Sequence, residues 1–198
     1  MFNFVTIIIS YLIAAINPAI VISKKVLKQD IRELGSKNAG TTNAIRTMGK
    51  GMGALVFVLD LIKVVISFGL LYLTAWIFKE EVTATTKTLY MLFSVLGHSY
   101  PVYYGFKGGK GVAVFLMSAI LVDYKMALIC VALGIVVIVI SRMVSLGSII
   151  GSIALIILDI FMPTSYEFWI LILVVAVVVY NHRTNIQRIL AGNENKLF

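Results

Sequence analysis

Residues 97–111 form a glycine- and lysine-rich segment whose composition suits anion binding. Its glycines and lysines after the aromatic stretch are Gly105, Lys107, Gly108, Gly109, Lys110 and Gly111. Glycine lets the backbone turn sharply and expose its N–H groups, and the first turn of a helix adds unpaired N–H donors and the positive end of its dipole. An apolar run over residues 112–122 follows directly. We therefore expect a loop that leads into a helix and binds a phosphate.

Other interpretations of this segment stay open. Its spacing does not match the P-loop of nucleotide-binding proteins, because three residues separate Gly105 from Gly109 and Gly111 stands where Ser or Thr is required. A nucleotide is therefore not the expected ligand. The segment can also be a plain turn between membrane helices whose lysines mark the cytoplasmic side. If a pocket forms here, His98 and Lys110 are expected to face it together.

A second polar cluster lies earlier in the chain, within residues 36–46. Its hydroxyl, amide and guanidinium side chains are Ser36, Asn38, Thr41, Thr42, Asn43 and Arg46. The planar fork of an arginine matches phosphate oxygens, and hydroxyls with amides at this density suit a phosphorylated polyol. A solvated loop that ends in a helix cap is the competing interpretation.

The third cluster covers residues 181–194 near the end of the chain. If this segment is helical, His182 and Asn185 share one face at spacing i, i+3, so both can point back toward the membrane surface. The ordinary pKa of histidine suits proton transfer near neutral pH. A single histidine beside a membrane is, however, more often an interfacial residue than a catalyst.

The elements that must position these clusters are membrane helices. The chain has 198 residues, 60% of them apolar, and a mean hydropathy of +1.00, which is too hydrophobic for a soluble domain. We expect a single all-α domain over residues 1–198 with seven spans, at residues 2–22, 52–78, 89–104, 112–122, 126–140, 144–161 and 168–180. Residues 1–23 carry no charge and no cleavage pattern, so we expect a first span and not a removable signal.

The fourth of these segments is short. Residues 112–122 provide eleven apolar positions, whereas a span needs about 20. It can cross only with the help of the glycine loop before it and Asp123 after it. A five-span alternative would read residues 112–140 as one crossing and would bury Asp123 and Lys125, at a cost of about 2.5 to 3.5 kcal/mol each. We therefore prefer seven spans.

The basic residues set the expected orientation. Most of the 17 Lys and Arg fall in the loops after the first, third, fifth and seventh expected spans. Because cytoplasmic loops are rich in Lys and Arg, the N-terminus is expected outside, the C-terminus in the cytoplasm, and all three polar clusters on the cytoplasmic face. The net charge of +8 then fits anionic lipid or an anionic substrate. Nucleic acid is not an expected partner, because the aromatic residues lie in apolar runs.

Few residues within the expected spans suggest other chemistry. Asp60 and Lys63 are three apart and are expected to pair on one helical face, most simply as a structural ion pair inside the membrane. The lone cysteine, Cys130, lies in an apolar run and is expected to serve packing, so neither a disulfide nor a cysteine-rich metal site can form. We expect no metal and no cofactor.

Taken together, the three clusters resemble the bacterial membrane-embedded acyl-phosphate:glycerol-3-phosphate acyltransferases over almost the whole chain. The first family pattern, Ser-x-Asn-x-Gly-x-Thr-Asn with a following Arg, is matched by Ser36, Asn38, Gly40, Thr42, Asn43 and Arg46. The second, Gly-His-x-aromatic-Pro leading to Phe-Lys-Gly-Gly-Lys-Gly, is matched within residues 97–111. The third is matched by His182, Arg183, Asn185, Ile186, Arg188, Gly192 and Glu194. Three matches in the same order are far more specific than any one of them.

The resemblance implies seven helices and transfer of an acyl group from acyl-phosphate to the sn-1 hydroxyl of glycerol 3-phosphate, which gives lysophosphatidic acid and phosphate for phospholipid biosynthesis. It implies a bacterial plasma membrane protein with its active site at the cytoplasmic face. The catalytic residues it suggests are Ser36, His182 and Asn185. The substrate-binding residues it suggests are Asn38, Thr42, Asn43, Arg46, His98, Lys107, Gly108, Gly109, Lys110 and Gly111. The family usually has a Gly-Ser pair before the proline of its first helix, whereas Ala15-Ile16-Asn17 precede Pro18 here.

The residue types suggest how such a transfer would proceed. Phosphate is a good leaving group, so the donor needs positioning and charge stabilisation more than a covalent enzyme intermediate. The His-x4-Asp dyad of soluble-type acyltransferases is absent, because the fifth residue after His182 is Gln187. The resemblance favours a route in which the substrate's own phosphate takes the proton, with His182 as general base the alternative. Acyl chain length, use of thioester donors and oligomeric state are left open.

Two other functions fit parts of the sequence. Seven helices with an anion-binding loop could form a transporter for a small phosphorylated anion, but such proteins usually place polar groups near the middle of the bilayer between repeated halves. Here the polar clusters are expected at one interface. A scaffold without chemistry would leave the coincidence of three clusters unexplained.

Overall fold

The structure is a computed structural model that describes residues 1–162 and 164–196, and this part of the chain folds into helices without a β-strand. The α-helices are α1 (Phe2–Ala14), α2 (Pro18–Val26), α3 (Thr41–Met48), α4 (Lys50–Phe78), α5 (Ala84–Ser99), α6 (Val112–Val122), α7 (Tyr124–Ser141), α8 (Val144–Phe161), α9 (Phe168–Asn181) and α10 (Arg183–Leu190). Two 3-10 turns, η1 (Ile31–Glu33) and η2 (Val102–Tyr104), lie in the loops. The all-helical prediction is confirmed for this part of the chain.

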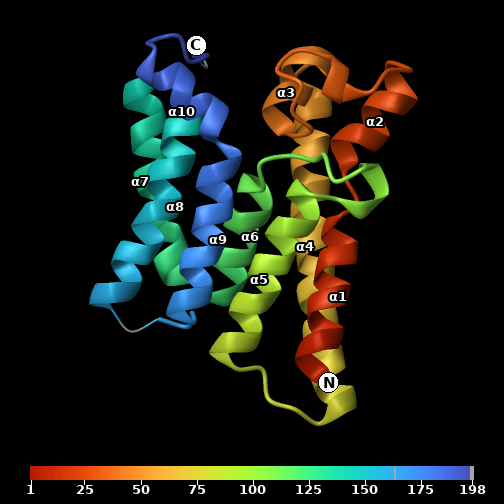
Figure 1. The fold of residues 1–198 in the computed structure, drawn as a ribbon, viewed down its shortest axis with the longest axis vertical. Coiled ribbons are helices and arrows are strands. Elements are labelled where there is room, and N and C mark those ends of the chain that lie inside the picture. The colour runs from red at the N-terminus through yellow and green to blue at the C-terminus, as the bar shows by residue number, and fades with distance from the viewer. Residues whose placement is uncertain (163, 197–198) are drawn as a thin grey trace.

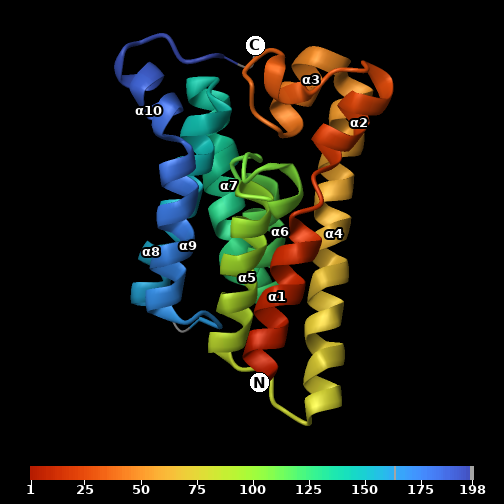
Figure 2. The same cartoon turned by 45° about the vertical axis from the view of Figure 1, so that its right-hand side comes forward.

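The helices form two groups that α6 and α9 join. Helices α4 and α5 both pack against α1, and α7 packs against α8, while α6 contacts α4, α5 and α7 and α9 contacts α5 and α8. The N-terminus and the connection from α4 to α5 lie at one end of the molecule (Figure 1). Helices α3 and α10 lie at the opposite end in both views (Figures 1 and 2). The polar clusters around α3 and α10 therefore share one end of the bundle, as expected.

The first expected span is broken. Pro18 has no backbone N–H and begins α2 at a position where that group would be unpaired anyway. Asn17 precedes it in an extended conformation, and its Oδ1 accepts a hydrogen bond of 3.1 Å from Ile20 N, which caps the new helix. The segment Phe2–Val26 is still long and apolar enough for one crossing.

Length and composition identify some, but not all, of the expected spans in the described residues. Phe2–Val26, Lys50–Phe78, Tyr124–Ser141 and Val144–Phe161 qualify, and α9 with α10, bent by 58°, qualifies only if the two helices are counted together as one span. The expected span at residues 89–104 had the wrong bounds, because its helix begins at Ala84 and ends at Ser99, just before Tyr100 and Pro101. A proline disfavours the helical conformation of the residue that precedes it. Helix α6 has 11 residues and is a shorter apolar helix. The count of seven spans stays a prediction.

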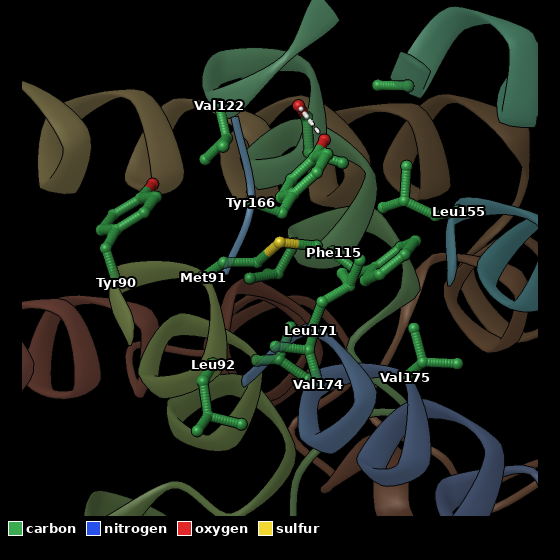
Figure 3. Packing of buried hydrophobic residues seen from close by; sticks show 14 of the residues in the cluster. Tyr90, Met91, Leu92, Phe115, Val122, Leu155, Tyr166, Leu171, Val174 and Val175 are labelled. Atoms are coloured by element: carbon green, nitrogen blue, oxygen red, sulfur yellow. Dashed lines mark hydrogen bonds between the residues drawn. The ribbon is translucent and has the colours of Figure 1, made fainter. Parts of the chain in front are cut away.

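Buried apolar side chains from both groups form one main core. It gathers residues of α1 and of α4 to α9, including Tyr90, Leu155 and Leu171 (Figure 3). The Tyr166 hydroxyl donates a hydrogen bond of 3.0 Å to Ala119 O, which satisfies a polar group inside this core. Cys130 belongs to the same core and is a free, buried thiol, which confirms its expected packing role.

Candidate functional site

A cavity of about 570 Å³ opens between the three polar clusters. Its lining draws on the loop before α3, on α3 itself, on the start of α6 and on α10. The residues expected at the site that line it are Ser36, Asn38, Thr42, Asn43, Arg46, His98, Lys110, Gly111, His182 and Asn185. Lys107, Gly108 and Gly109 are absent from the lining. The structure thus brings together three segments that are far apart in the sequence.

Asn43 holds the backbone of the loop that precedes α3. Its Oδ1 accepts a hydrogen bond of 2.9 Å from Ser36 N, and its Nδ2 donates to Ile31 O at 3.1 Å and to Leu34 O at 3.0 Å. Asn43 is almost fully buried, so both ends of its amide serve the loop backbone. It was expected to bind substrate, but its contacts are those of a residue that shapes the loop carrying Ser36. Ser36 and Arg46 themselves line the cavity.

Half of the glycine loop faces the protein and not the cavity. Gly108 N donates to Ser99 O at 3.0 Å and Gly109 N donates to His98 O at 3.2 Å, so neither N–H is available for an anion. A methyl group at Gly109 would overlap His98 Nε2 and Ala39 O, which explains why glycine is needed there. These two N–H groups hold the loop against the end of α5, and a role of Gly108 and Gly109 in substrate binding stays a prediction.

The later part of the loop does reach the cavity. Gly111 has a backbone φ of 84°, in the left-handed region that favours glycine, and it caps the start of α6. Gly111 lines the cavity together with Val112 and Ala113, in the first turn of that helix. The positive end of the α6 dipole therefore faces the cavity, as the sequence predicts.

Lys110 is the loop's cationic contribution to the site. Burial lowers its pKa to about 8, the Glu194 carboxylate opposes that shift, and the positive charges of Arg188 and Arg46 add to it. The ammonium group is therefore close to its titration range near neutral pH, and a bound anion would favour its charged form. Lys107, in contrast, has an exposed side chain.

The backbone at Lys107 is held by an arginine that the sequence analysis did not identify. Arg32 Nη1 donates to Tyr104 O at 2.7 Å and to Lys107 O at 3.0 Å, while its Nε and Nη2 bind the two oxygens of Asp30 at 2.9 and 2.8 Å. These hydrogen bonds hold the pKa of Asp30 well below its usual range. Arg32 lies outside the three clusters, and no local pattern marks it.

A backbone contact of His182 defines the tautomer of its neutral ring. Its Nδ1 lies 2.8 Å from Val178 O, and a carbonyl oxygen can only accept, so Nδ1 carries the proton of the neutral ring. Nε2 is then an unprotonated acceptor. The side chain is 2% exposed and lines the cavity at the bend between α9 and α10. This is the tautomer that a general base or a hydroxyl acceptor requires.

Glu194 holds the rest of the third cluster. Its Oε1 accepts hydrogen bonds from Asn185 Nδ2 at 2.6 Å and from Ser145 Oγ at 2.9 Å, and its Oε2 accepts one from Arg188 Nε at 2.8 Å. Burial alone would raise the pKa of Glu194, but these three hydrogen bonds outweigh it and leave the pKa below its usual value. Asn185 Oδ1 is left buried without a hydrogen-bond partner among the described residues.

Helix α8 adds residues that the sequence analysis missed. Ser145 and Ser148 line the cavity, but isolated serines in an apolar run carry no pattern by which they could be recognised. Glu194 was noted only as part of a family pattern, without a role. Arg188 and Lys196 also line the cavity and add positive charge to that of Arg46 and Lys110.

The expected pair between Asp60 and Lys63 forms, at 2.7 Å, and it has a third member. Lys63 Nζ lies 3.0 Å from His98 Nδ1. Both Asp60 and His98 line the cavity, so the pair lies beneath the site and is more than an isolated structural ion pair.

An apolar cavity of about 130 Å³ adjoins the polar one between α6, α7 and α8. The two cavities share Val112, Leu116 and Ser148 as lining residues. A cationic chamber that continues into an apolar one suits a molecule with an anionic head and a hydrocarbon tail. In the described residues no group of three or more His, Cys, Asp or Glu side chains could hold a metal ion.

Comparison with known proteins agrees with this geometry. The sequence model of the family described as glycerol-3-phosphate acyltransferase matches residues 4–192. Glycerol-3-phosphate acyltransferases of Thermoanaerobacter pseudethanolicus and Clostridioides difficile are 39% and 36% identical to the chain, over 100% and 96% of it and 96% and 93% of their own lengths.

A solved structure has the same fold. The crystal structure of PlsY (YgiH), an integral membrane glycerol 3-phosphate acyltransferase, in its glycerol 3-phosphate form superposes with a TM-score of 0.85 at 36% identity, over 98% of this chain and 94% of that one. Its lysophosphatidic acid form superposes with a TM-score of 0.82. A polar cavity built from three sequence clusters, apolar helices around it and relatives that match nearly end to end make this chain a member of the glycerol-3-phosphate acyltransferase family, an integral membrane acyltransferase.

Proposed function

We propose that the protein transfers an acyl group from acyl-phosphate to the sn-1 hydroxyl of glycerol 3-phosphate, releasing lysophosphatidic acid and phosphate. The observation that carries this proposal is the junction of the two cavities at Val112, Leu116 and Ser148. It joins a chamber for phosphorylated head groups to an apolar chamber for a tail. The PlsY structures in glycerol 3-phosphate and lysophosphatidic acid forms support the acceptor and the product.

The head group of glycerol 3-phosphate would lie among the cationic side chains. Arg46 on α3 and Lys110 in the glycine loop line the same cavity, so together they can neutralise one phosphate. Ser36, Asn38 and Thr42 supply hydroxyl and amide groups for the glycerol hydroxyls. The second phosphate, that of the donor, would be held at Arg188 and the first turn of α6.

The reaction is an attack of the sn-1 oxygen on the acyl carbonyl carbon. The new C–O ester bond forms, the C–O bond to the phosphate breaks, and the phosphate leaves with the bonding electron pair. The hydroxyl proton passes to an acceptor, which in our proposal is the phosphate of the bound substrate. His182 Nε2 and Asn185 Oδ1 are both acceptors, and in our proposal they accept from the substrate hydroxyl and orient it for this transfer.

The acyl chain would lie in the apolar cavity. Its walls are formed by α6, α7 and α8, where Gly134, Gly147 and Gly151 allow the helix backbones of α7 and α8 to approach closely. Ser148 lies at the boundary between the two cavities, where the acyl carbonyl is expected. No residue of the described chain is needed as a covalent acyl carrier in this scheme.

We also propose that the protein lies in the bacterial plasma membrane with seven spans, its N-terminus outside and the polar cavity at the cytoplasmic face. The clustering of α3 and α10 at the end opposite the N-terminus supports this orientation (Figure 1), and so does the distribution of Lys and Arg. Cysteine accessibility at Ser36, Lys110 and His182 tests it, since all three must be labelled from the same side.

Purified protein in detergent tests the chemistry. Labelled glycerol 3-phosphate is supplied with acyl-phosphate, acyl-coenzyme A or acyl-carrier protein in separate reactions, and lysophosphatidic acid is measured. We expect product with acyl-phosphate alone. Product with a thioester donor only would contradict the proposed donor. A protein that makes no product but moves labelled phosphate into sealed vesicles would be a transporter.

A further inference from the structure

The break in the first span removes the helical donor of the Ile16 carbonyl. In a continuous helix Ile20 N would donate to Ile16 O, but here it donates to Asn17 Oδ1 at 3.1 Å. Lys63 on α4 supplies the replacement, because its Nζ lies 2.7 Å from Ile16 O. Lys63 is 7% exposed, so its charge is held inside the bundle. The break in one helix is therefore tied to a buried cation on another.

The same ammonium group fixes His98. Lys63 Nζ lies 2.7 Å from Asp60 Oδ1 and 3.0 Å from His98 Nδ1. Asp60 Oδ1 also lies 3.3 Å from His98 Nδ1, so this ring nitrogen contacts both members of the ion pair, and its Nε2 is directed away from them. That Nε2 lies against Gly109, where a methyl group would overlap both it and Ala39 O. Lys63 thus holds the ring against which the glycine loop packs.

Asn17 completes the connection from the other side. Its Nδ2 donates to Ala39 O at 3.2 Å, and Asn17 is fully buried. Ala39 lies between Asn38 and Gly40, which both line the polar cavity. The contacts form a closed ring, which we call the alignment ring, and its members are Ile16, Asn17, Ala39, Lys63, His98 and Gly109.

The alignment ring connects the glycine loop, which carries Lys110, with the loop before α3, the helix that carries Arg46. One side of the ring is next to Lys110, and the other belongs to the loop that leads into α3 and Arg46. A buried ion pair by itself is weak evidence for a contribution to stability, because desolvation offsets the attraction. A role in holding geometry explains why the pair is placed directly beneath the cavity.

We propose that Lys63 and Asn17 are positioning residues that fix the spacing between the glycine loop and the loop before α3, so that Lys110 and Arg46 reach one phosphate together. This inference rests on the proposed function. It assigns a purpose to the Ala15-Ile16-Asn17 segment, where this chain departs from the usual family pattern, and to Lys63, which does not line the cavity.

The test uses the full chain in detergent with variants on both sides of the ring. The double variant Asp60→Asn/Lys63→Met removes both charges, because Lys63→Met alone would leave a buried carboxylate unpaired and risk loss of folding. Asn17→Ala breaks the ring at Ala39 and leaves the ion pair intact. The matched control is Tyr90→Phe, which removes a buried hydrogen bond of 2.7 Å between α5 and α4, to Val64 O, but lies outside the ring.

Two readouts are measured on folded, monodisperse protein. We expect kcat/KM for glycerol 3-phosphate to fall at least about tenfold in both ring variants and to stay within about twofold in Tyr90→Phe, since misplaced binding groups weaken transition-state stabilisation. We also expect faster trypsin cleavage after Lys37 and Lys107, which are exposed in the two loops. A purely structural role would lower the yield of folded protein and leave both values unchanged.

The outcomes separate this inference from the proposed function. Unchanged kcat/KM and an unchanged cleavage pattern in Asn17→Ala would overturn the alignment role, whether or not the double variant folds. An inactive wild-type protein would instead overturn the proposed function, and the trypsin measurement would still decide between alignment and its absence. Slower transfer with faster cleavage in both loops would support the proposal.

Discussion

Asn185 Nδ2 lies 2.6 Å from Glu194 Oε1, and this contact fixes which end of the amide is left for a ligand. Because a carboxylate can only accept, the NH2 group must face Glu194. The oxygen of Asn185 is then left buried and unpaired within the described structure. An unpaired buried acceptor costs free energy unless a ligand donates to it. The relationship points to a substrate hydroxyl as its partner.

Glu194→Gln is expected to reduce turnover about tenfold. The neutral amide keeps the shape of the side chain but weakens the charge-assisted hydrogen bonds to Arg188 and Asn185, and it allows the Asn185 amide to rotate. Initial rates with acyl-phosphate and glycerol 3-phosphate check this. Glu33→Gln on η1 is the control, since Glu33 is exposed and outside the cavity lining. Equal rates for both variants would show that Glu194 does not orient the site.

His182→Ala is expected to lower kcat at least about 100-fold, because it removes an acceptor held in one tautomer at the bend before α10. The pH profile of kcat then separates two roles. If substrate phosphate accepts the proton, the residual activity keeps a limb near the second pKa of a phosphate ester, about 6. If His182 is the base, that limb disappears. Full activity in the variant would contradict both versions.

Lys110 predicts a loss of substrate affinity in alkaline solution. Its pKa is lowered to about 8, so the ammonium group is charged below that pH and neutral above it. We expect KM for glycerol 3-phosphate to be constant from about pH 6.5 to 7.5 and to rise as the pH passes through 8. Lys110→Arg should flatten this rise, because a guanidinium stays charged over the whole range. The same alkaline rise in both proteins would assign the titration to another group.

Gly109→Ala is expected to reduce activity at least about tenfold or to prevent folding, since the added methyl group would overlap His98 Nε2 and Ala39 O. Gly69→Ala on α4 is the matched control, because no atom lies within 4 Å of a methyl group there. In a helix interior that change should be neutral or stabilise by about 0.5–1 kcal/mol. Thermal unfolding and initial rates measure both. Full activity of Gly109→Ala would show that the loop can shift to accommodate the methyl group without loss of function.

The sequence predicted the helical class, most helix positions and the three segments that form the cavity. It did so because long apolar runs and dense polar clusters are local patterns. The bounds of α5 were missed since Tyr100 and Pro101 end the helix inside an aromatic stretch that still looks apolar. The break at Pro18 lies inside a segment, residues 2–22, that was predicted as one span.

The roles of individual site residues were harder to predict from the sequence than the helices were. Asn43 and Gly109 were expected to bind substrate, yet their contacts hold the loops in place. A sequence pattern marks residues that a site requires without showing whether they touch a ligand or a neighbour. Arg32 and Ser145 carry no pattern at all, because their partners come from distant parts of the chain.

The apolar cavity has one more consequence. Ile135 is among its lining residues, and this side chain is 54% exposed on the outer surface of α7. A tail seated there would already border the surrounding leaflet. The finished lipid could leave by sliding sideways, without its hydrocarbon ever entering water, and the soluble phosphate would depart by a separate, aqueous route.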